Sequence, residues 1–173
     1  MTVRAWHRIR AAYDRIDRYV TAALARVGIP ALRISLGIVF LWFGALKLFP
    51  GLSPAQDLAA DTIERLTLGV VPPDVALVGL GLWECAIGIG LLSGVLLRVT
   101  LLLLVVQMAG TITPLFLFPT ETFTAFPYAP TLEGQYIIKN IVLVAAALVV
   151  GATVRGGGLS PEPDTPPAEV LPD

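Results

Sequence analysis

The chain has 173 residues, of which 55% are hydrophobic and only 14% are charged, and its mean hydropathy is +0.78. Water-soluble domains rarely have such a composition. The net charge of −1 conceals a basic N-terminal region, but its arginines precede an apolar segment. A phospholipid surface is therefore the simpler partner, and we expect no nucleic-acid partner.

Residues 1–27 predict an amphipathic helix that lies on the inner leaflet of a membrane. Its apolar side chains recur at steps of three and four, with the arginines mostly on other faces: Trp6, Ile9, Tyr13, Ile16, Val20, Leu24 and Val27. A docking helix for a cytoplasmic partner is the alternative interpretation. Because about 27 polar and basic residues precede the first long apolar run, we expect no cleaved signal peptide.

Four apolar runs of roughly 20 residues are long enough to cross the ~30 Å of hydrocarbon in a bilayer. They cover about residues 28–48, 75–97, 99–118 and 134–154. Unpaired backbone groups in hydrocarbon would cost several kcal/mol, so these runs must be helices. The predicted fold class is all-α, an integral membrane four-helix bundle over residues 28–154 with the N-terminal amphipathic interfacial helix before it.

The basic residues indicate the orientation of these spans, since Lys and Arg are retained on the cytoplasmic side. Six arginines precede the first span, Arg98 separates the second from the third, and Arg155 follows the fourth. The loop 49–74 holds only Arg65, and the loop 119–133 holds no Lys or Arg. We expect both termini in the cytoplasm and a location in the bacterial cytoplasmic (inner) membrane.

The connecting segments have their own patterns. The stretch "SPAQ" predicts a short external helix over about 54–67, with Ser53 as N-cap and Gln56 completing a capping box. The loop 119–133 combines prolines with aromatic residues, which favours an ordered cap at the membrane interface. Residues 155–173 are rich in glycine, proline and acids, and we expect a disordered acidic tail.

The sequence lacks the cysteine and histidine residues that several kinds of redox and metal site require. Cys85 is the single cysteine, so a dithiol pair within the chain is excluded. His7 is the single histidine and lies outside the spans, which leaves no intramembrane ligand set for haem, zinc or an iron-sulfur centre. We expect no metal site and no intrinsic cofactor.

Glu84 is the exception to the apolar pattern, because it lies in the middle of the uncharged run "GLGLWECAIGIGLL". Gly81, Glu84 and Gly88 share one helical face, and small residues allow another helix to approach closely. A charge at the bilayer centre costs at least ~2.5 kcal/mol, so this acid should point into the bundle and be paired or protonated.

Helical depth, at ~1.5 Å per residue, suggests the partners of Glu84. Glu84 lies roughly 15 Å inside the outer boundary, Lys139 about 8 to 11 Å and Lys47 only a few Å, which favours Lys139. The predicted polar cluster, a candidate ligand site without an assigned catalytic residue, comprises Glu84, Lys139, Gln107, Tyr136, Lys47, Gln135 and Asn140. A Glu84 to Lys139 bridge that only fixes helix register is the alternative.

Three segments together resemble the DoxX-like superfamily of small four-span bacterial membrane proteins, and most closely its YkgB-type branch. They are "LRISLGIVFLWFGALKLFP", "WECAIGIGLL" and "EGQYIIKNIVLV", within residues 32–151. The positions that match the pattern of the superfamily are Arg33, Trp42, Gly44, Lys47, Glu84, Gly88, Gly134, Gln135, Lys139 and Asn140.

The resemblance implies a role in redox chemistry, because some DoxX-like proteins are membrane subunits of oxidoreductase complexes that oxidise thiosulfate to quinone or act in thiol-oxidant defence. This sequence lacks the second soluble domain of the thiosulfate enzymes, so we expect a subunit or anchor of a quinone- or thiol/sulfur-linked complex. Whether the chain itself is an enzyme stays open. Its expected ligands are a quinone or a lipid, and its expected partners are the bilayer and either another protein or further copies of itself. A small-solute or proton-coupled carrier and a purely structural accessory subunit are the alternatives.

Overall fold

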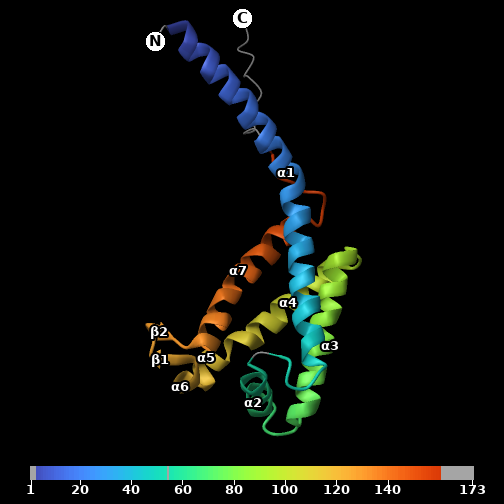
Figure 1. Cartoon of the computed structure of the whole chain (residues 1–173). Helices are drawn as coiled ribbons and strands as arrows, with labels where there is room; N and C mark the ends of the chain where they lie inside the picture. The colour runs from blue at the N-terminus through green and yellow to red at the C-terminus, as the bar shows by residue number, and fades with distance from the viewer. Residues whose placement is uncertain (1–2, 54, 161–173) are drawn as a thin grey trace, which may run out of the picture.

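The computed structural model describes residues 3–53 and 55–160, and this part is almost entirely helical (Figure 1). The helices are α1 (Val3–Lys47), α2 (Gln56–Leu66), α3 (Pro73–Ser93), α4 (Leu97–Ile112), α5 (Pro114–Leu117), α6 (Pro119–Thr122) and α7 (Leu132–Ala152). Two short strands, β1 (Phe123–Ala125) and β2 (Ala129–Pro130), pair antiparallel between α6 and α7. The all-α class is confirmed.

Four segments of the described residues are helical, long and apolar enough to cross a membrane. They are Ala12–Lys47, Pro73–Ser93, Leu97–Leu117 and Leu132–Ala152. The last three agree with the predicted spans after shifts of one to four residues at their ends. The protein is therefore a multi-pass membrane protein, as its composition predicts.

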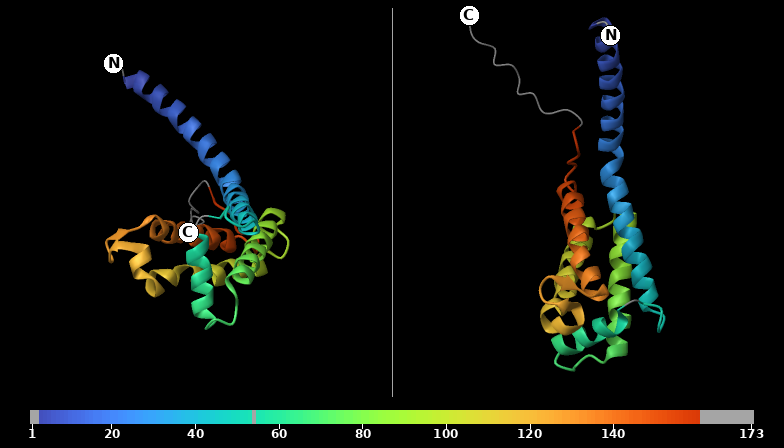
Figure 2. Two further views of the ribbon diagram at one scale, coloured as in Figure 1. Left: turned by 60° about the horizontal axis from the view of Figure 1, so that its bottom comes forward. Right: turned by 60° about the vertical axis from the view of Figure 1, so that its left-hand side comes forward.

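Helix α1 joins two elements that the sequence analysis treats as separate. It runs without interruption from Val3 to Lys47, with Pro30 inside it, and its N-terminal part extends far beyond the bundle (Figures 1 and 2). Ala31, Leu32 and Arg33 follow Pro30 and are good helix formers, and the helix continues through the proline. Tyr13, Ile16 and Val20 are exposed on the extension, and its placement on a leaflet stays a prediction.

Helices α1 and α3 pack closely along most of the bundle because glycines line their contact. A Cβ atom at Gly44 would lie 2.8 Å from the backbone nitrogen of Cys85, and one at Gly88 would lie 2.5 Å from the backbone nitrogen of Leu41. The predicted face of Gly81, Glu84 and Gly88 is buried. Small residues thus bring these two backbones together, as in other membrane helix pairs.

The remaining spans complete the bundle. Helix α4 packs against α3 and α7, and α7 also contacts α1. Their apolar core comprises Leu36, Phe40, Ile87, Leu91, Leu104, Met108, Ala146, Ala147 and Val150. At one end of the bundle, α2 lies near α5 and α6 (Figure 1), so the two loops that were predicted to be external form one cap.

The start of α2 differs from the prediction. Its N-cap residue is Ala55, in the left-handed conformation at φ 51°, and Ala55 makes no side-chain cap hydrogen bond. The side-chain Oε1 of Gln56 instead accepts a hydrogen bond from the backbone N–H of Gly51, at 3.1 Å. The predicted capping box with Ser53 as N-cap is therefore wrong, because Gln56 holds the preceding loop. Pro54 lies outside the described residues.

The predicted interfacial loop 119–133 is ordered into α6 and the β1–β2 hairpin. Before it, α4 ends at Ile112 and α5 begins at Pro114, since a proline cannot donate the backbone hydrogen bond that would continue the helix. Most of the predicted disordered tail, residues 161–173, lies outside the described residues, so that prediction is unchanged.

Candidate functional site

Three spans each contribute one polar side chain to a cluster around Glu84, here called the Glu84 cluster. Lys47 Nζ on α1 lies 2.7 Å from Glu84 Oε2 on α3. Gln107 Nε2 on α4 donates a hydrogen bond of 2.6 Å to Glu84 Oε1. Both oxygens of the carboxylate therefore have a donor, which compensates for its removal from water.

The Glu84 cluster is deep in the protein. Glu84 is 7% exposed and Gln107 is 9% exposed, and the side chain of Lys47 is 13% exposed. Glu84 is the twelfth residue of α3, counted from Pro73, and so lies about halfway along this 21-residue helix. Burying a charged pair at this depth costs free energy unless hydrogen bonds satisfy both groups. Ionisable residues inside a membrane therefore often have a functional role.

The partner predicted for Glu84 was wrong, because the ion pair is made by Lys47 and not by Lys139. Gly44 fixes α1 directly against Glu84, and Lys47 follows one turn later on the same face. Its long side chain then reaches back into the bundle to the level of the carboxylate. The sequence-based estimate compared only the depths of the Cα atoms and did not include the length of the lysine side chain.

The α7 residues of the predicted cluster form a separate group. Lys139, Tyr136 and Gln135 are exposed, and Asn140 is partly buried. Lys139 Nζ lies 6.0 Å from the centroid of the Tyr136 ring. The structure therefore brings Glu84, Lys47 and Gln107 together, and places the four α7 residues elsewhere.

One buried atom of the Glu84 cluster has no hydrogen-bond partner among the described residues. Gln107 Oε1 is buried, and no hydrogen bond to it is formed within residues 3–53 and 55–160. The amide orientation follows from chemistry, since an ionised carboxylate accepts only and must face the Nε2 group. A buried acceptor without a donor costs about 1 to 3 kcal/mol. Gln107 Oε1 thus marks a position where a donor group would bind favourably.

Arg33 caps the C-terminus of α3. The sequence analysis included Arg33 among the positions that match the superfamily pattern, but it did not predict this role. Its guanidinium donates to the backbone carbonyl of Leu91 at 2.6 Å and to that of Leu92 at 3.4 Å. These carbonyls belong to the last turn of α3, which ends at Ser93 and has Gly94 as its C-cap residue with φ 71°. A cation at a helix C-terminus is favourable, so Arg33 anchors the other end of the α1–α3 pair.

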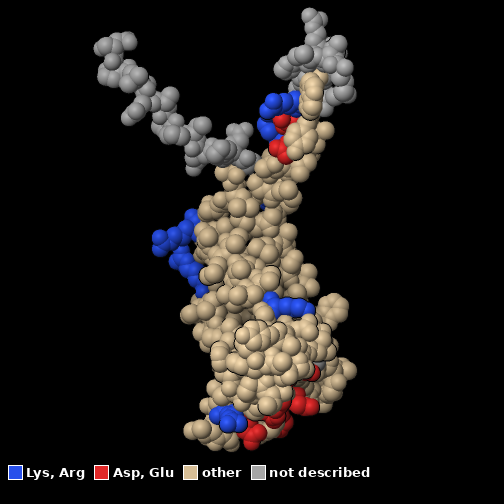
Figure 3. Space-filling model, turned by 90° about the vertical axis from the view of Figure 1, so that its left-hand side faces the viewer, with Lys and Arg blue, Asp and Glu red and all other residues tan. Residues whose placement is uncertain are grey.

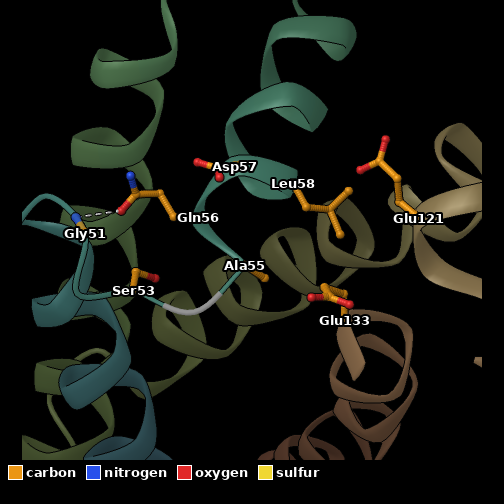
Figure 4. A pocket seen from close by; sticks show the side chains of 8 residues that line it. All are labelled: Gly51, Ser53, Ala55, Gln56, Asp57, Leu58, Glu121 and Glu133. Atoms are coloured by element: carbon orange, nitrogen blue, oxygen red, sulfur yellow. Dashed lines mark hydrogen bonds between the residues drawn. The ribbon is translucent and has the colours of Figure 1, made fainter. Parts of the chain in front are cut away.

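A hollow lies at the capped end of the bundle, apart from the Glu84 cluster (Figure 4). Its volume is about 570 Å³, and its lining residues are Gly51, Ser53, Ala55, Gln56, Asp57, Leu58, Glu121 and Glu133. The sequence analysis missed it because the lining comes from three separate segments. Its three acids make it electronegative, although the described residues contain no group of three His, Cys, Asp or Glu side chains that could hold a metal ion.

The sequence comparison identifies the family of this four-span chain. The sequence model of the DoxX family matches residues 28–124, which include all three residues of the Glu84 cluster. The chain belongs to the DoxX family. No curated protein and no solved structure matches this DoxX-family chain significantly. The assignment to the YkgB-type branch stays a prediction.

Proposed function

We propose that this DoxX-family protein is a subunit or anchor of a redox complex in the bacterial inner membrane, with both termini in the cytoplasm. The complex would be linked to a quinone or to thiol/sulfur chemistry. In this proposal the Glu84 cluster receives a quinone headgroup from the bilayer. The observation that carries the proposal is the buried ion pair of Lys47 and Glu84 beside the unpaired acceptor Gln107 Oε1.

The three side chains suit the two redox forms of such a headgroup. A quinone supplies two-electron chemistry coupled to protons when it is bound. The Lys47 ammonium carries three hydrogens and can donate one to a carbonyl oxygen. Gln107 Oε1 can accept from the hydroxyl group of the reduced form. Glu84 can hold or release the proton at its carboxylate, with Lys47 stabilising the charge that remains.

The binding part of the proposal is tested on the purified chain in lipid nanodiscs. We expect a long-chain ubiquinone or menaquinone to be retained by the native chain. The double variant Glu84→Gln with Lys47→Met removes the Lys47 donor without leaving a buried charge, and Gln107→Leu removes the acceptor. Each should reduce the bound quinone by at least about fivefold, as losing one hydrogen bond of ~1 kcal/mol predicts. Thr100→Val is the matched control, because it removes another buried hydrogen-bonding group of α4. Equal retention in all variants would contradict quinone binding at the Glu84 cluster.

The assembly part needs a separate experiment in the native host. The tagged chain should copurify with an oxidoreductase subunit, and the assembled complex should reduce or oxidise quinone. Glu84→Gln combined with Lys47→Met should keep the assembly but lose this activity, since the proton-exchanging group is absent. Copurification without any effect on activity would instead indicate a purely structural accessory subunit. Proton-coupled solute uptake by liposomes that contain the chain alone would indicate a carrier.

A further inference from the structure

Lys139 is an exposed cation on the membrane-spanning helix α7, and within residues 3–53 and 55–160 it forms no ion pair. The side chain lies on α7, seven residues after Leu132. Nearby residues of the same helix are apolar and exposed, with Ile138 at 42%, Ile141 at 70% and Val142 at 65%. Such side chains on the outside of a span face lipid. Among the described residues the one ion pair is that of Lys47 with Glu84, so Lys139 lacks a carboxylate partner there.

The depth of Lys139 defines what it can reach. Helix α7 has 21 residues, about 31 Å at ~1.5 Å per residue, which is close to the thickness of the hydrocarbon. The Cα atom of Lys139 therefore lies roughly 10 Å inside the helix start. A lysine side chain extends roughly 6 Å and points toward the helix N-terminus, so its ammonium can approach the headgroup level. The position of Lys139 Nζ over Tyr136, one turn nearer that end, agrees with this direction.

Two further donors lie on the same face as Lys139. Gln135 and Tyr136 precede it by four and three residues, and both are exposed. Their amide and hydroxyl groups can donate hydrogen bonds alongside the ammonium. Glu133 lies away from this face and lines the hollow at the capped end. Figure 3 shows acids at the lower end of the molecule and a few more on the extension of α1 at the top, whereas the wall of the bundle between them shows isolated basic patches on a largely uncharged surface.

We propose that Lys139, with Tyr136 and Gln135, binds the phosphate group of a phospholipid in the leaflet at the α2 end of the bundle. A phosphodiester offers the negative charge and the acceptor oxygens that these three donors lack. Anionic phosphatidylglycerol is the preferred lipid, because the headgroup of phosphatidylcholine carries its own cation. This site shares no residue with the Glu84 cluster and does not depend on quinone binding.

Native mass spectrometry of the full chain in detergent, titrated with phosphatidylglycerol, tests the site. We expect Lys139→Gln to weaken the tightest binding roughly fivefold, the factor that corresponds to ~1 kcal/mol for each basic residue at a lipid surface. Lys139→Arg should stay within about twofold of the native chain, since Arg also binds phosphate. Arg65→Gln is the matched control, because it removes the same charge from the exposed surface of α2 and should leave binding unchanged.

A second variant separates loss of the site from loss of the fold. Tyr136→Phe with Gln135→Ala retains the charge but removes two donors, and we expect binding to weaken about two- to threefold. Equal binding by the native chain and Lys139→Gln would overturn the proposal, and so would an equal loss in Arg65→Gln. A carbodiimide cross-link between Lys139 and a carboxylate of another protein chain in native membranes would also overturn it, since the counter-ion would then be a protein.

Discussion

Gly44 of α1 and Glu84 of α3 are in direct contact, because a Cβ atom at residue 44 would lie 2.8 Å from the Cβ atom of Glu84. This contact sets the register of the first two spans. With residue 44 opposite Glu84, the lysine three positions later is placed to reach the carboxylate, and Lys47 does so at 2.7 Å. A packing feature of small residues therefore determines which cation neutralises the buried acid.

The first prediction concerns this ion pair. Glu84→Gln leaves the Lys47 ammonium without its counter-ion inside the bundle, and we expect the free energy of unfolding to fall by ~3 kcal/mol. Adding Lys47→Met should recover much of that loss, because the double variant has no charge left to compensate. Unfolding in mixed detergent micelles, followed by circular dichroism, measures all three chains.

The control for this double-mutant cycle replaces Lys139 instead of Lys47. Combining Glu84→Gln with Lys139→Met should give additive effects, since the structure separates these two residues. Rescue by Lys139→Met but not by Lys47→Met would contradict the ion pair described here.

The second prediction concerns the close approach of α1 and α3. Gly88→Ala adds a methyl group that would lie 2.5 Å from the backbone nitrogen of Leu41, so the helices must separate. We expect a loss of ~1 to 3 kcal/mol in the free energy of unfolding. Gly79→Ala on the same helix is the control, because nothing lies within 4 Å of its added Cβ. A neutral effect of Gly88→Ala would show that the pair is looser than the structure indicates.

The third prediction concerns Arg33 as the cap of α3. Arg33→Gln removes the charged donor from the carbonyls of Leu91 and Leu92, and we expect a loss of ~1.5 to 3 kcal/mol in stability. Arg98→Gln is the control, since Arg98 is an exposed arginine near the same end of α3. Hydrogen exchange of the last turn of α3 should increase in Arg33→Gln alone. Unchanged exchange there would assign Arg33 no capping role.

Much of this architecture could be predicted from the sequence because a bilayer imposes long apolar helices. The buried face of Gly81, Glu84 and Gly88 followed from helical spacing alone. Choosing between Lys47 and Lys139 needed the distance between helices and the direction of each side chain, which spacing within a single helix does not contain. The unbroken course of α1 was also missed. The amphipathic pattern of residues 1–27 gives way to a continuous apolar run at residue 28, and such a change of pattern does not tell whether one helix ends there or continues.

The last prediction concerns the orientation of the bundle. The positive-inside distribution places the α2 cap and the β1–β2 hairpin outside the cytoplasm, and the residues after α7 inside. In a Cys85→Ser background, Asp61→Cys and Tyr128→Cys should react with an impermeant thiol reagent in intact cells, since both positions are exposed in the structure. Gly158→Cys, also exposed, should react only after the cells are permeabilised. Labelling of residue 158 in intact cells, with residues 61 and 128 protected, would reverse the topology and would place the cap in the cytoplasm. It would also move the proposed site at Lys139 to the inner leaflet, whereas the ion pair of Lys47 and Glu84 depends only on the packing of α1 against α3.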